Sequence, residues 1–332
     1  MNIQNLMDKW GVNGNFCAAQ NGETLFSCAH GYYDIENRAE YTADTRTYVA
    51  SVTKQFTAVC VMMLQEKGLI DIDHTLDNYV PEYRFANKVT LRQMLNMTSG
   101  IPNELSVIGR RLHARRAEFD MSDDDFERRA SRETAPEKCT PADFLEIVNA
   151  EPMEFEPGER FDYSDTNYML LGHIVERVTG VPYAEFMRIN IFEPLGMSRS
   201  IIGADHSDGP SYRVFGGKLY NMGWAHFTTG EGSISTTAED LCKWLNAVLD
   251  GKFISAESWK QCFTLVHDTY GFGWHGKGDW FCHGGGDLGY SSMVWINPAR
   301  KIAMAGAMNM PAGDGKTSFY DELFDMINDG VR

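Results

Sequence analysis

The chain has 332 residues, of which 43% are hydrophobic and 23% are charged, the balance of a globular protein with enough apolar mass for a sizeable core. Its 30 Lys and Arg against 46 Asp and Glu give a net charge of −16, and so acidic a surface repels phosphate backbones and anionic lipid headgroups. We therefore expect no nucleic-acid or membrane partner. No run approaches the roughly 20 apolar residues of a membrane span, so we expect no membrane anchor.

The cysteines and the N-terminus bear on the cellular compartment. The seven cysteines are an odd number, are widely spaced and form no C-x-x-C pair, which favours reduced thiols. Residues 1–10 lack the basic start and the apolar run of a secretory signal. We therefore expect a cytoplasmic protein, unless a secretion signal has been removed from this sequence. The sequence leaves the oligomeric state open.

The first elements along the chain are a strand hairpin and a long helix. Residues 14–36 alternate in a strand-like way around Asn21-Gly22, which is a strong hairpin turn signal. Between Ser51 and about Lys67 apolar residues recur at helical spacing, and Gly68 follows where a C-terminal cap belongs.

Mainly helical patterns continue through the middle of the chain. Thr140 is typical of a helix N-cap, because Pro141 follows at the first helical position and Asp143 stands three residues on. Further helices are predicted over 90–97, from 168 to 178 with a stop at Gly180, from 237 to about 251, and over 319–327.

After residue 269 the pattern changes to short segments rich in aromatic and β-prone residues. Four antiparallel strands are predicted, over 270–275, 279–283, 291–297 and 301–308. Strands near both chain ends with helices between them predict an α+β protein, in which an antiparallel sheet flanked by helices carries an inserted, mainly helical lobe. We expect a single module over residues 1–332, with the sheet lobe from about 1–66 and 205–332 and the helical lobe from about 67–204.

The segment 103–140 is dense in charge, with four arginines between 110 and 116 and three consecutive aspartates at 123–125. A solvated helical face or loop is the first interpretation. A lid over an active site is the alternative, and the sequence does not decide between them.

The residues that carry chemistry begin with Ser51-Val52-Thr53-Lys54. At the start of a helix, positions i and i+3 share one face, so Lys54 can reach the serine hydroxyl. The helix N-terminus also offers unpaired N–H groups to a developing oxyanion. The sequence contains no H-E-x-x-H and no paired Cys/His spacing, so we expect no metal site.

Several further motifs follow Ser51 in order. They are residues 51–58 (SVTKQFTA), 95–102 (LNMTSGIP), 155–165 (FEPGERFDYSD), 168–172 (YMLLG), 194–197 (PLGM), 235–241 (STTAEDL), and 283–286 (HGGG) with 289–292 (GYSS). Together they span roughly residues 15 to 310. The chain resembles the serine β-lactamase and penicillin-binding-protein-like superfamily, specifically the branch of class C β-lactamases, DD-carboxypeptidases, D-aminopeptidases and related esterases of the peptidase S12 type.

This resemblance implies a β-lactamase/DD-peptidase-like fold and a set of roles. Ser51 resembles the nucleophile, Lys54 its proton-managing partner, and Tyr163 the tyrosine of the second motif, Tyr-x-Asn. His283, Gly284 and Gly285 resemble the third motif, Lys-Thr-Gly or His-x-Gly, on the strand that lines the substrate site. The backbone N–H groups of Ser51 and Gly286 would form the oxyanion hole, and no cofactor is implied.

A serine hydroxyl needs a base within hydrogen-bond reach, and neither lysine nor tyrosine is a base at its ordinary pKa of about 10. A partly buried ammonium beside a phenol favours the phenolate, so we expect Lys54 and Tyr163 to titrate together and share one proton. Tyr163, assisted by Lys54, would then take the Ser51 proton and later return one to the leaving group.

Two departures from the family pattern bear on the substrate. Asp165 stands where the lactamase branch has asparagine, and it could pair with Lys54, bind a substrate amine, repel a carboxylate, or be a variant without effect on selectivity. His283 replaces lysine, so a fixed positive charge for a substrate carboxylate is missing. Both changes favour substrates with a neutral or cationic group near the scissile bond.

The sequence thus predicts a serine hydrolase that acts through an acyl-serine on small-molecule esters or on D-amino-acid-containing amides or peptides. A true β-lactamase or DD-carboxypeptidase is the first alternative, and an acyltransferase would use the same residues. From another class, a sensor would become acylated and stay so, and a scaffold would have lost activity.

Overall fold

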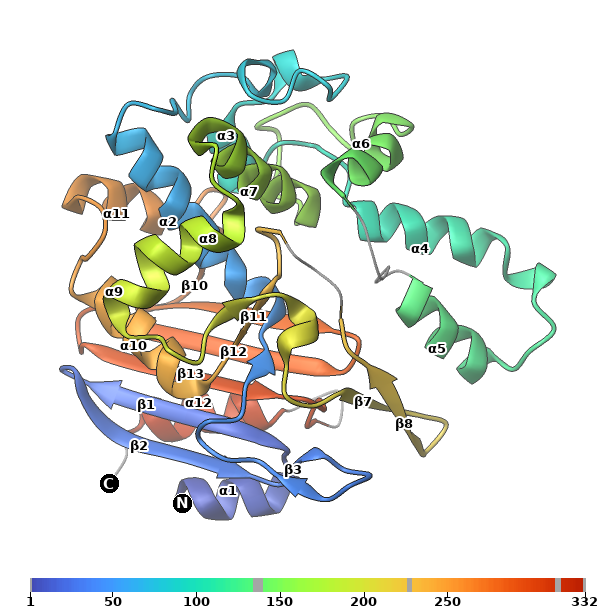
Figure 1. The fold of residues 1–332 in the computed structure, drawn as a ribbon, viewed down its shortest axis with the longest axis vertical. Helices are drawn as coiled ribbons and strands as arrows, with labels where there is room; N and C mark the ends of the chain where they lie inside the picture. Colours follow the sequence, from blue (N-terminus) through green and yellow to red (C-terminus); the bar gives the residue numbers. More distant parts are fainter. Residues whose placement is uncertain (1, 134–139, 226–228, 314–317, 331–332) are drawn as a thin grey trace.

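Six strands from both ends of the chain form one antiparallel sheet in the order β10-β11-β12-β13-β1-β2 (Figure 1). This computed structural model describes residues 2–133, 140–225, 229–313 and 318–330. The strands are β1 Gly14–Gln20, β2 Glu23–His30, β10 His275–Lys277, β11 Trp280–Asp287, β12 Tyr290–Asn297 and β13 Ile302–Met308. The predicted α+β fold class is confirmed, as is the turn at Asn21-Gly22 between β1 and β2.

Helices cover both faces of the central strands. On one face α10 (Ala238–Leu249) packs against β1 and β13. On the other, α1 (Ile3–Trp10) and α12 (Phe319–Asn328) share an apolar cluster with Phe16 and Ala18 of β1, while Cys17 between them belongs to the main core. Because both faces are covered, β13 is buried along its whole length.

The other helices lie mainly between residues 50 and 206, on one side of the sheet (Figure 1). They are α2 Thr53–Glu66, α3 Leu91–Leu95, α4 Glu104–Ala114, α5 Asp123–Glu133, α6 Pro141–Asn149, α7 Asp165–Thr179, α8 Tyr183–Met187, α9 Glu193–Leu195 and, later in the chain, α11 Ala256–Phe263. Short 3-10 turns are η1 Ala50–Val52, η2 Leu76–Asn78, η3 Ala86–Lys88, η4 Arg116–Glu118 and η6 Ala204–His206, and η5 Arg188–Phe192 is a π-helical turn.

The predicted helices are confirmed, with shifted boundaries. The helix expected from Ser51 begins as the 3-10 turn η1 before it continues as α2. Thr140 and Asp143 form the reciprocal capping box expected at the start of α6. Gly180, with a φ of 68°, ends α7 in the left-handed conformation that glycine accommodates without strain.

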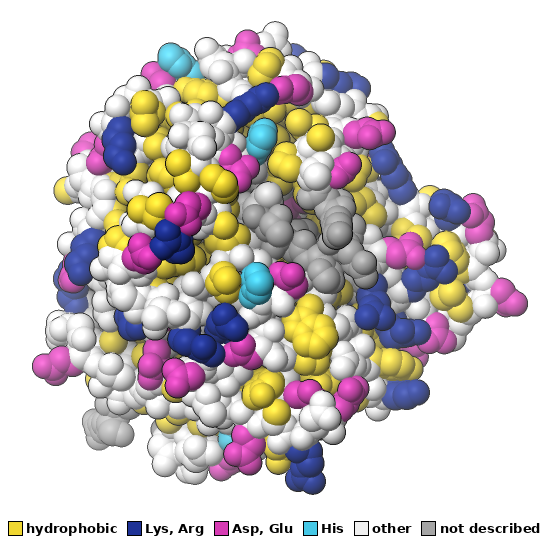
Figure 2. All heavy atoms as spheres, in the orientation of Figure 1, with side chains coloured by type: hydrophobic (Ala, Val, Ile, Leu, Met, Phe, Trp, Pro, Cys, Tyr) yellow, Lys and Arg dark blue, Asp and Glu magenta, His cyan; other side chains and the backbone are white. Residues whose placement is uncertain are grey.

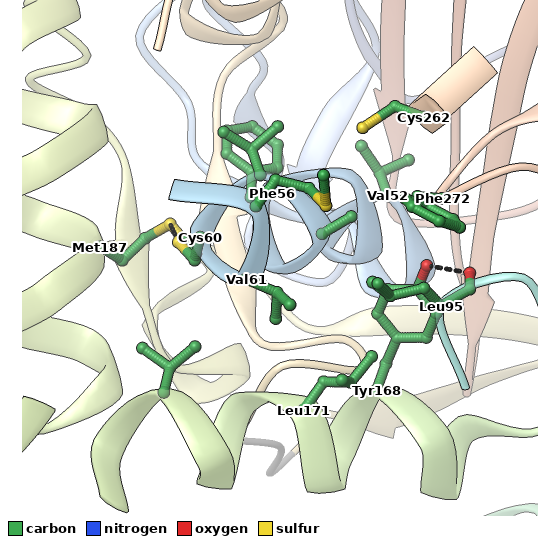
Figure 3. Close-up of a cluster of buried hydrophobic side chains, with 14 of the residues drawn as sticks. Val52, Phe56, Cys60, Val61, Leu95, Tyr168, Leu171, Met187, Cys262 and Phe272 are labelled. Atoms are coloured by element: carbon green, nitrogen blue, oxygen red, sulfur yellow. Dashed lines mark hydrogen bonds between the residues drawn. The ribbon is translucent and has the colours of Figure 1, made fainter. Parts of the chain in front are cut away.

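The helix α2 is the centre of the main core (Figure 3). It is buried along most of its length, and apart from Thr57 its residues from Phe56 to Leu64 are apolar, as expected for a helix enclosed by other elements. Phe56 stacks on Trp244 of α10 with ring centroids 4.0 Å apart. On the side of α7, the Tyr168 hydroxyl donates a 2.7 Å hydrogen bond to the carbonyl of Leu95. The N-terminus of α2 is therefore held from several sides.

Some elements differ from the prediction. Residues 270–274 form no strand, because the chain turns at Gly273 (φ 82°), where an added Cβ would lie 2.8 Å from the Cα of Gln55. Tyr270 makes isolated bridges to Val266 and His275, and strand β10 begins at His275. The hairpin of β7 (Ser211–Phe215) and β8 (Lys218–Gly223) was not predicted from the sequence. Two further small sheets consist of β3 Tyr32–Asp34 with β4 Ala39–Glu40, and of β5 Thr47–Tyr48, β9 Ile234–Thr236 and β6 Ile201–Ile202.

The charge-dense segment forms a projection of α4 and α5 at the edge of the molecule, where acidic and basic side chains lie together (Figure 2). Many of these charges pair with each other, as Arg116 does with Asp123 at 2.8 Å and Arg129 with Glu133 at 2.5 Å. Residues 134–139 of this segment, including Cys139, lie outside the described residues, and the six described cysteines are free thiols.

The two-lobe division stays a prediction. Helix α2, which the proposed boundary after residue 66 places in the sheet lobe, packs closely against α7 of the helical lobe. Within the described part of the chain, no helix has both the length and the apolar content to cross a bilayer.

Candidate active site

Ser51 and Lys54 face each other at the N-terminal end of α2. Lys54 Nζ donates hydrogen bonds to Ser51 Oγ at 2.9 Å, to Asp165 Oδ1 at 2.5 Å and to the carbonyl oxygen of Glu231 at 2.6 Å. Its side chain is fully buried, and these three acceptors use all three hydrogens of an ammonium group. The geometry is that of a charged lysine.

The electrostatics of Lys54 agree with its geometry. Burial alone would lower the pKa of Lys54, but the Asp165 carboxylate and then Tyr163 outweigh it, so the pKa lies above its ordinary value. Among the roles considered for Asp165, the structure shows the ion pair with Lys54.

Tyr163 lies in the loop that leads into α7, with its ring centroid 4.9 Å from Lys54 Nζ. Neighbouring backbone groups fix this loop, since the N–H of Asp162 donates to the carbonyl of Met97 at 2.9 Å and that of Ser164 to its sulfur at 3.5 Å. The hydroxyl of Tyr163 is buried and, among the described residues, makes no well-formed hydrogen bond.

Opposing effects act on the pKa of the Tyr163 phenol. Burial raises the pKa of Tyr163 to about 12, although Lys54 and Ser51 both lie near enough to lower it. The predicted sharing of one proton between Lys54 and Tyr163 stays a prediction, and the directions of the two pKa shifts favour a charged lysine beside a neutral tyrosine. Asp165 holds the lysine in its charged form, and burial holds the tyrosine in its neutral form.

The glycines of the third motif let β11 lie directly on the serine backbone. A Cβ on Gly285 would stand 2.1 Å from the carbonyl oxygen of Val49 and 3.1 Å from the nitrogen of Ser51, so a larger residue would displace the strand. Gly286, the next residue, lines the same cavity as Ser51. Gly284 instead faces the Met293 side chain, where its Cβ would meet Cε at 3.0 Å.

His283 is buried behind the site and lines neither of the two cavities that share Gly286. Its Nδ1 lies 2.6 Å from the carbonyl oxygen of Gly284 and must donate, so in the neutral ring Nε2 accepts from the Tyr270 hydroxyl at 2.8 Å. Burial, then Lys54 and His275, lower the pKa of His283 well below its ordinary value. Among the predicted substrate-binding residues, His283 and Gly284 thus take supporting positions.

Two cavities meet at Gly286 and Asp287. The smaller, of about 40 Å³, is next to Ser51 and is lined by Tyr48, Ala50, Ser51, Leu105, Asp165, Glu231, Gly232, Gly286 and Asp287. The larger, of about 400 Å³, runs outward along the end of β11 to Arg213 of β7 and Ser131 of α5. The charge-dense segment thus contributes to the wall of the larger cavity.

Buried carboxyl groups surround this end of the site. Burial, then the nearby Asp165, raises the pKa of Glu104 to about 8. Burial raises the pKa of Glu231 to about 7 and that of Asp287 to about 7, although Arg213 lowers the latter. Among the described residues, no group of three or more His, Cys, Asp and Glu side chains is arranged to hold a metal ion.

Three residues that line the two cavities were not predicted from the sequence: Glu231, Asp287 and Arg213. Asp287 directly follows the HGGG motif, and Glu231 stands between Gly230 and Gly232, so both had a local signal of close backbone packing. A Cβ on Gly230 would lie 2.6 Å from the carbonyl oxygen of Tyr168, which confirms the tight approach. Arg213 had no such signal, because it lies on the hairpin that the strand pattern did not predict.

Comparisons with known proteins agree with this geometry. The family described as Beta-lactamase matches residues 2–321. Penicillin-binding protein 4* of Bacillus subtilis (strain 168) is 27% identical over 323 residues, which cover 88% of this chain and 67% of that protein. The chain therefore spans about two thirds of the length of this relative.

Solved structures show the same fold. The penicillin-binding protein from Bacillus halodurans matches with a TM-score of 0.80 and 23% identity, over 98% of this chain and 99% of that one. The D-amino acid amidase from Ochrobactrum anthropi SV3, complexed with L-phenylalanine, also gives a TM-score of 0.80 at 23% identity, over 99% of this chain and 98% of that one.

Proposed function

Since the chain belongs to the β-lactamase family of serine hydrolases, we propose that it forms an acyl-enzyme on Ser51 and hydrolyses esters or D-amino-acid-containing amides or peptides. The observation that carries this proposal is the 2.9 Å hydrogen bond from Lys54 Nζ to Ser51 Oγ, beside a buried Tyr163 hydroxyl that has no hydrogen-bond partner among the described residues. A charged donor on the nucleophile, next to a group that can relay a proton, suits acyl transfer.

The neutral state of Tyr163 supports a relay without a free phenolate. As Ser51 Oγ bonds to the acyl carbon, its proton passes to the Tyr163 oxygen, and the proton of Tyr163 passes to the leaving nitrogen or oxygen as its bond to the carbon breaks. Tyr163 begins and ends the step neutral. The Lys54 ammonium stays charged and stabilises the negative charge that develops on Ser51 Oγ.

The tetrahedral oxyanion would be held by the backbone N–H groups of Ser51 and Gly286. Two preorganised donors of this kind contribute about 3–4 kcal/mol each to transition-state stabilisation. In deacylation the steps reverse: water attacks the acyl carbon, its proton passes to Tyr163, and the proton of Tyr163 returns to Ser51.

The substrate class rests on the charges of the site. His283 is buried behind the site, Lys54 is paired with Asp165, and the described lining of the cavity at Ser51 contains no lysine or arginine. Arg213 lines the larger, adjoining cavity, so a substrate carboxylate directly beside the scissile bond has no counter-charge in the Ser51 cavity itself. Esters and amides with a neutral or cationic acyl group fit better than carboxylate-bearing β-lactams. The likeness to a D-amino acid amidase supports including amides of D-amino acids.

A substrate panel with a nucleophile variant tests this proposal. We expect turnover of p-nitrophenyl esters or D-aminoacyl p-nitroanilides to exceed that of a chromogenic cephalosporin. Ser51→Ala should abolish both turnover and the transient acyl adduct seen by intact mass spectrometry, while the exposed Ser198→Ala should change neither. Activity retained by Ser51→Ala would refute the nucleophile, and an adduct that never clears would identify a sensor instead.

A further inference from the structure

The cavity next to Ser51 contains carboxylate oxygens that have no partner. Glu231 is only 3% exposed, and its Oε1 is buried without a hydrogen bond in the described structure. Oδ2 of Asp287 is in the same situation, because its Oδ1 alone accepts the N–H of Leu288 at 2.9 Å. Both residues line the 40 Å³ cavity with Ser51.

The cavity has an excess of potential negative charge. Its described lining includes three carboxyl groups, of Asp165, Glu231 and Asp287, and contains no lysine or arginine. The three hydrogens of the Lys54 ammonium are already used, and Arg213, which lowers the pKa of Asp287, lines the adjoining larger cavity. Burial without partners raises the pKa of Glu231 and of Asp287 to about 7, and an occupant that donates hydrogen bonds and carries positive charge would favour the ionised form of both.

The size and position of the cavity restrict that occupant. A volume of about 40 Å³ accommodates one group the size of a water molecule or an ammonium, and little more. It adjoins Ser51 and Gly286, where the reacting carbonyl would sit under the proposed function. In an α-aminoacyl group, the nitrogen lies about 2.5 Å from the carbonyl carbon, so an amine attached there reaches such a cavity.

We propose that this cavity binds a primary ammonium group of the substrate, with Asp287 and Glu231 as its acceptors. The substrate class is then esters and amides of acids with a free α-amino group. Asp287 and Glu231 determine specificity and take no part in the proton relay. This inference rests on the proposed acyl transfer at Ser51 and deepens it.

The test compares substrates that differ in the amine. For the wild type, kcat/KM should be higher for D-alanine p-nitroanilide than for propionyl p-nitroanilide. Asp287→Asn should lower kcat/KM for D-alanine p-nitroanilide about 10- to 100-fold more than for propionyl p-nitroanilide, since a hydrogen bond to a charged group is lost only with the amine. Asp279→Asn, exposed in the turn between β10 and β11, makes the same charge change away from the cavity and should alter neither. Equal losses on both substrates would overturn the inference.

A second measurement uses the wild type and does not depend on how a variant folds. n-Propylammonium should competitively inhibit hydrolysis of p-nitrophenyl propionate, while n-propanol at the same concentration should not. Equal or absent inhibition by the two compounds would mean that the cavity holds only water. These results remain distinct from failure of the proposed function, which would appear as propionate ester hydrolysis that survives Ser51→Ala.

Discussion

The site at the end of α2 and the projection of α4 and α5 are built from the same charged residue types, yet they behave differently. On the projection, Arg116 pairs with an Asp123 whose side chain is 95% exposed, so water solvates the charges whether or not they pair. At the site, Lys54 is fully buried and Asp165 is 14% exposed, so neither charge has much water to replace its partner. Burial, rather than the number of charges, therefore decides how much an ion pair contributes to stability and to chemistry.

The largest expected effect comes from removing the buried cation. Lys54→Met leaves the Asp165 carboxylate without its partner, so we expect the free energy of unfolding to fall by about 3–5 kcal/mol and kcat to fall at least about 1,000-fold. Arg129→Met breaks the ion pair with Glu133 on the projection and should cost less than about 1 kcal/mol, with no loss of kcat. Urea denaturation and ester kinetics check both. Similar stability losses in the two variants would contradict the comparison.

The hydroxyl of Tyr163 should matter for activity but not for stability. Because it makes no well-formed hydrogen bond in the described structure, Tyr163→Phe should leave the unfolding free energy unchanged or slightly higher, while the lost proton relay lowers kcat by about 100- to 10,000-fold. Tyr168→Phe is the matched opposite, since its hydroxyl bonds to the carbonyl of Leu95. It should lose about 1 kcal/mol of stability and keep most of its activity. A Tyr163→Phe enzyme with normal kcat would rule out the relay.

Buried and exposed carboxyl groups should also give opposite dependences of stability on pH. The pKa of Glu231 is raised to about 7 by burial, whereas the Arg177 guanidinium lowers the pKa of the exposed Glu82 to about 2. Above about pH 4.5, Glu231 loses its proton in the unfolded state but keeps it in the native state. Its contribution to the unfolding free energy therefore decreases between about pH 4.5 and 7 and is constant above pH 7. For Glu82 the contribution is present above about pH 4.5 and is lost as the pH falls toward 2.

Variants of Glu231 and Glu82 separate the two pH dependences of the unfolding free energy. The unfolding free energies of the wild type and of Glu231→Gln can be measured by urea denaturation between pH 4.5 and 7.5. As the pH rises across this range, the stability of the variant should increase relative to the wild type by about 3 kcal/mol. For Glu82→Gln, the difference in unfolding free energy from the wild type should stay nearly constant over the same pH range. A flat difference for Glu231→Gln would show that this carboxyl ionises as it does in water.

The same contrast explains what the sequence could and could not predict. Periodicity and capping residues located most helices and the strands near both chain ends, since the burial of one face and the turn geometry depend on residues that are close in sequence. The motifs also named Ser51, Lys54 and Tyr163, which the fold brings together from segments more than one hundred positions apart. The proton distribution was not predictable, because it depends on how deeply Asp165 and Tyr163 are buried, and burial is a property of the packed chain.

The sequence motifs did not identify Glu231 and Asp287 for the same reason: both residues reach the site only through the packing of the folded chain. Glu231 and Asp287 are unremarkable acids in the sequence of a protein with a net charge of −16. Only when β11 and the 230–232 backbone close on Ser51 do they meet at one cavity. The turn at Gly273 likewise depends on its contact with α2, and the alternation of residues in the sequence does not predict such a contact.

The smallest expected effect is a change of preference rather than a loss. Asp165→Asn keeps the shape of the side chain and removes one negative charge beside Ser51, so Lys54 gains a net positive charge that its pair had balanced. The ratio of kcat/KM for a carboxylate-bearing cephalosporin to that for D-alanine p-nitroanilide should rise about tenfold, since the charge change acts with opposite sign on the two substrates. Asp123→Asn removes the same charge on the projection, where water screens it, and should leave the ratio unchanged. If Asp165→Asn also leaves the ratio unchanged, then Asp165 serves only to hold Lys54, and the preference for amines must come from Asp287 and Glu231 alone.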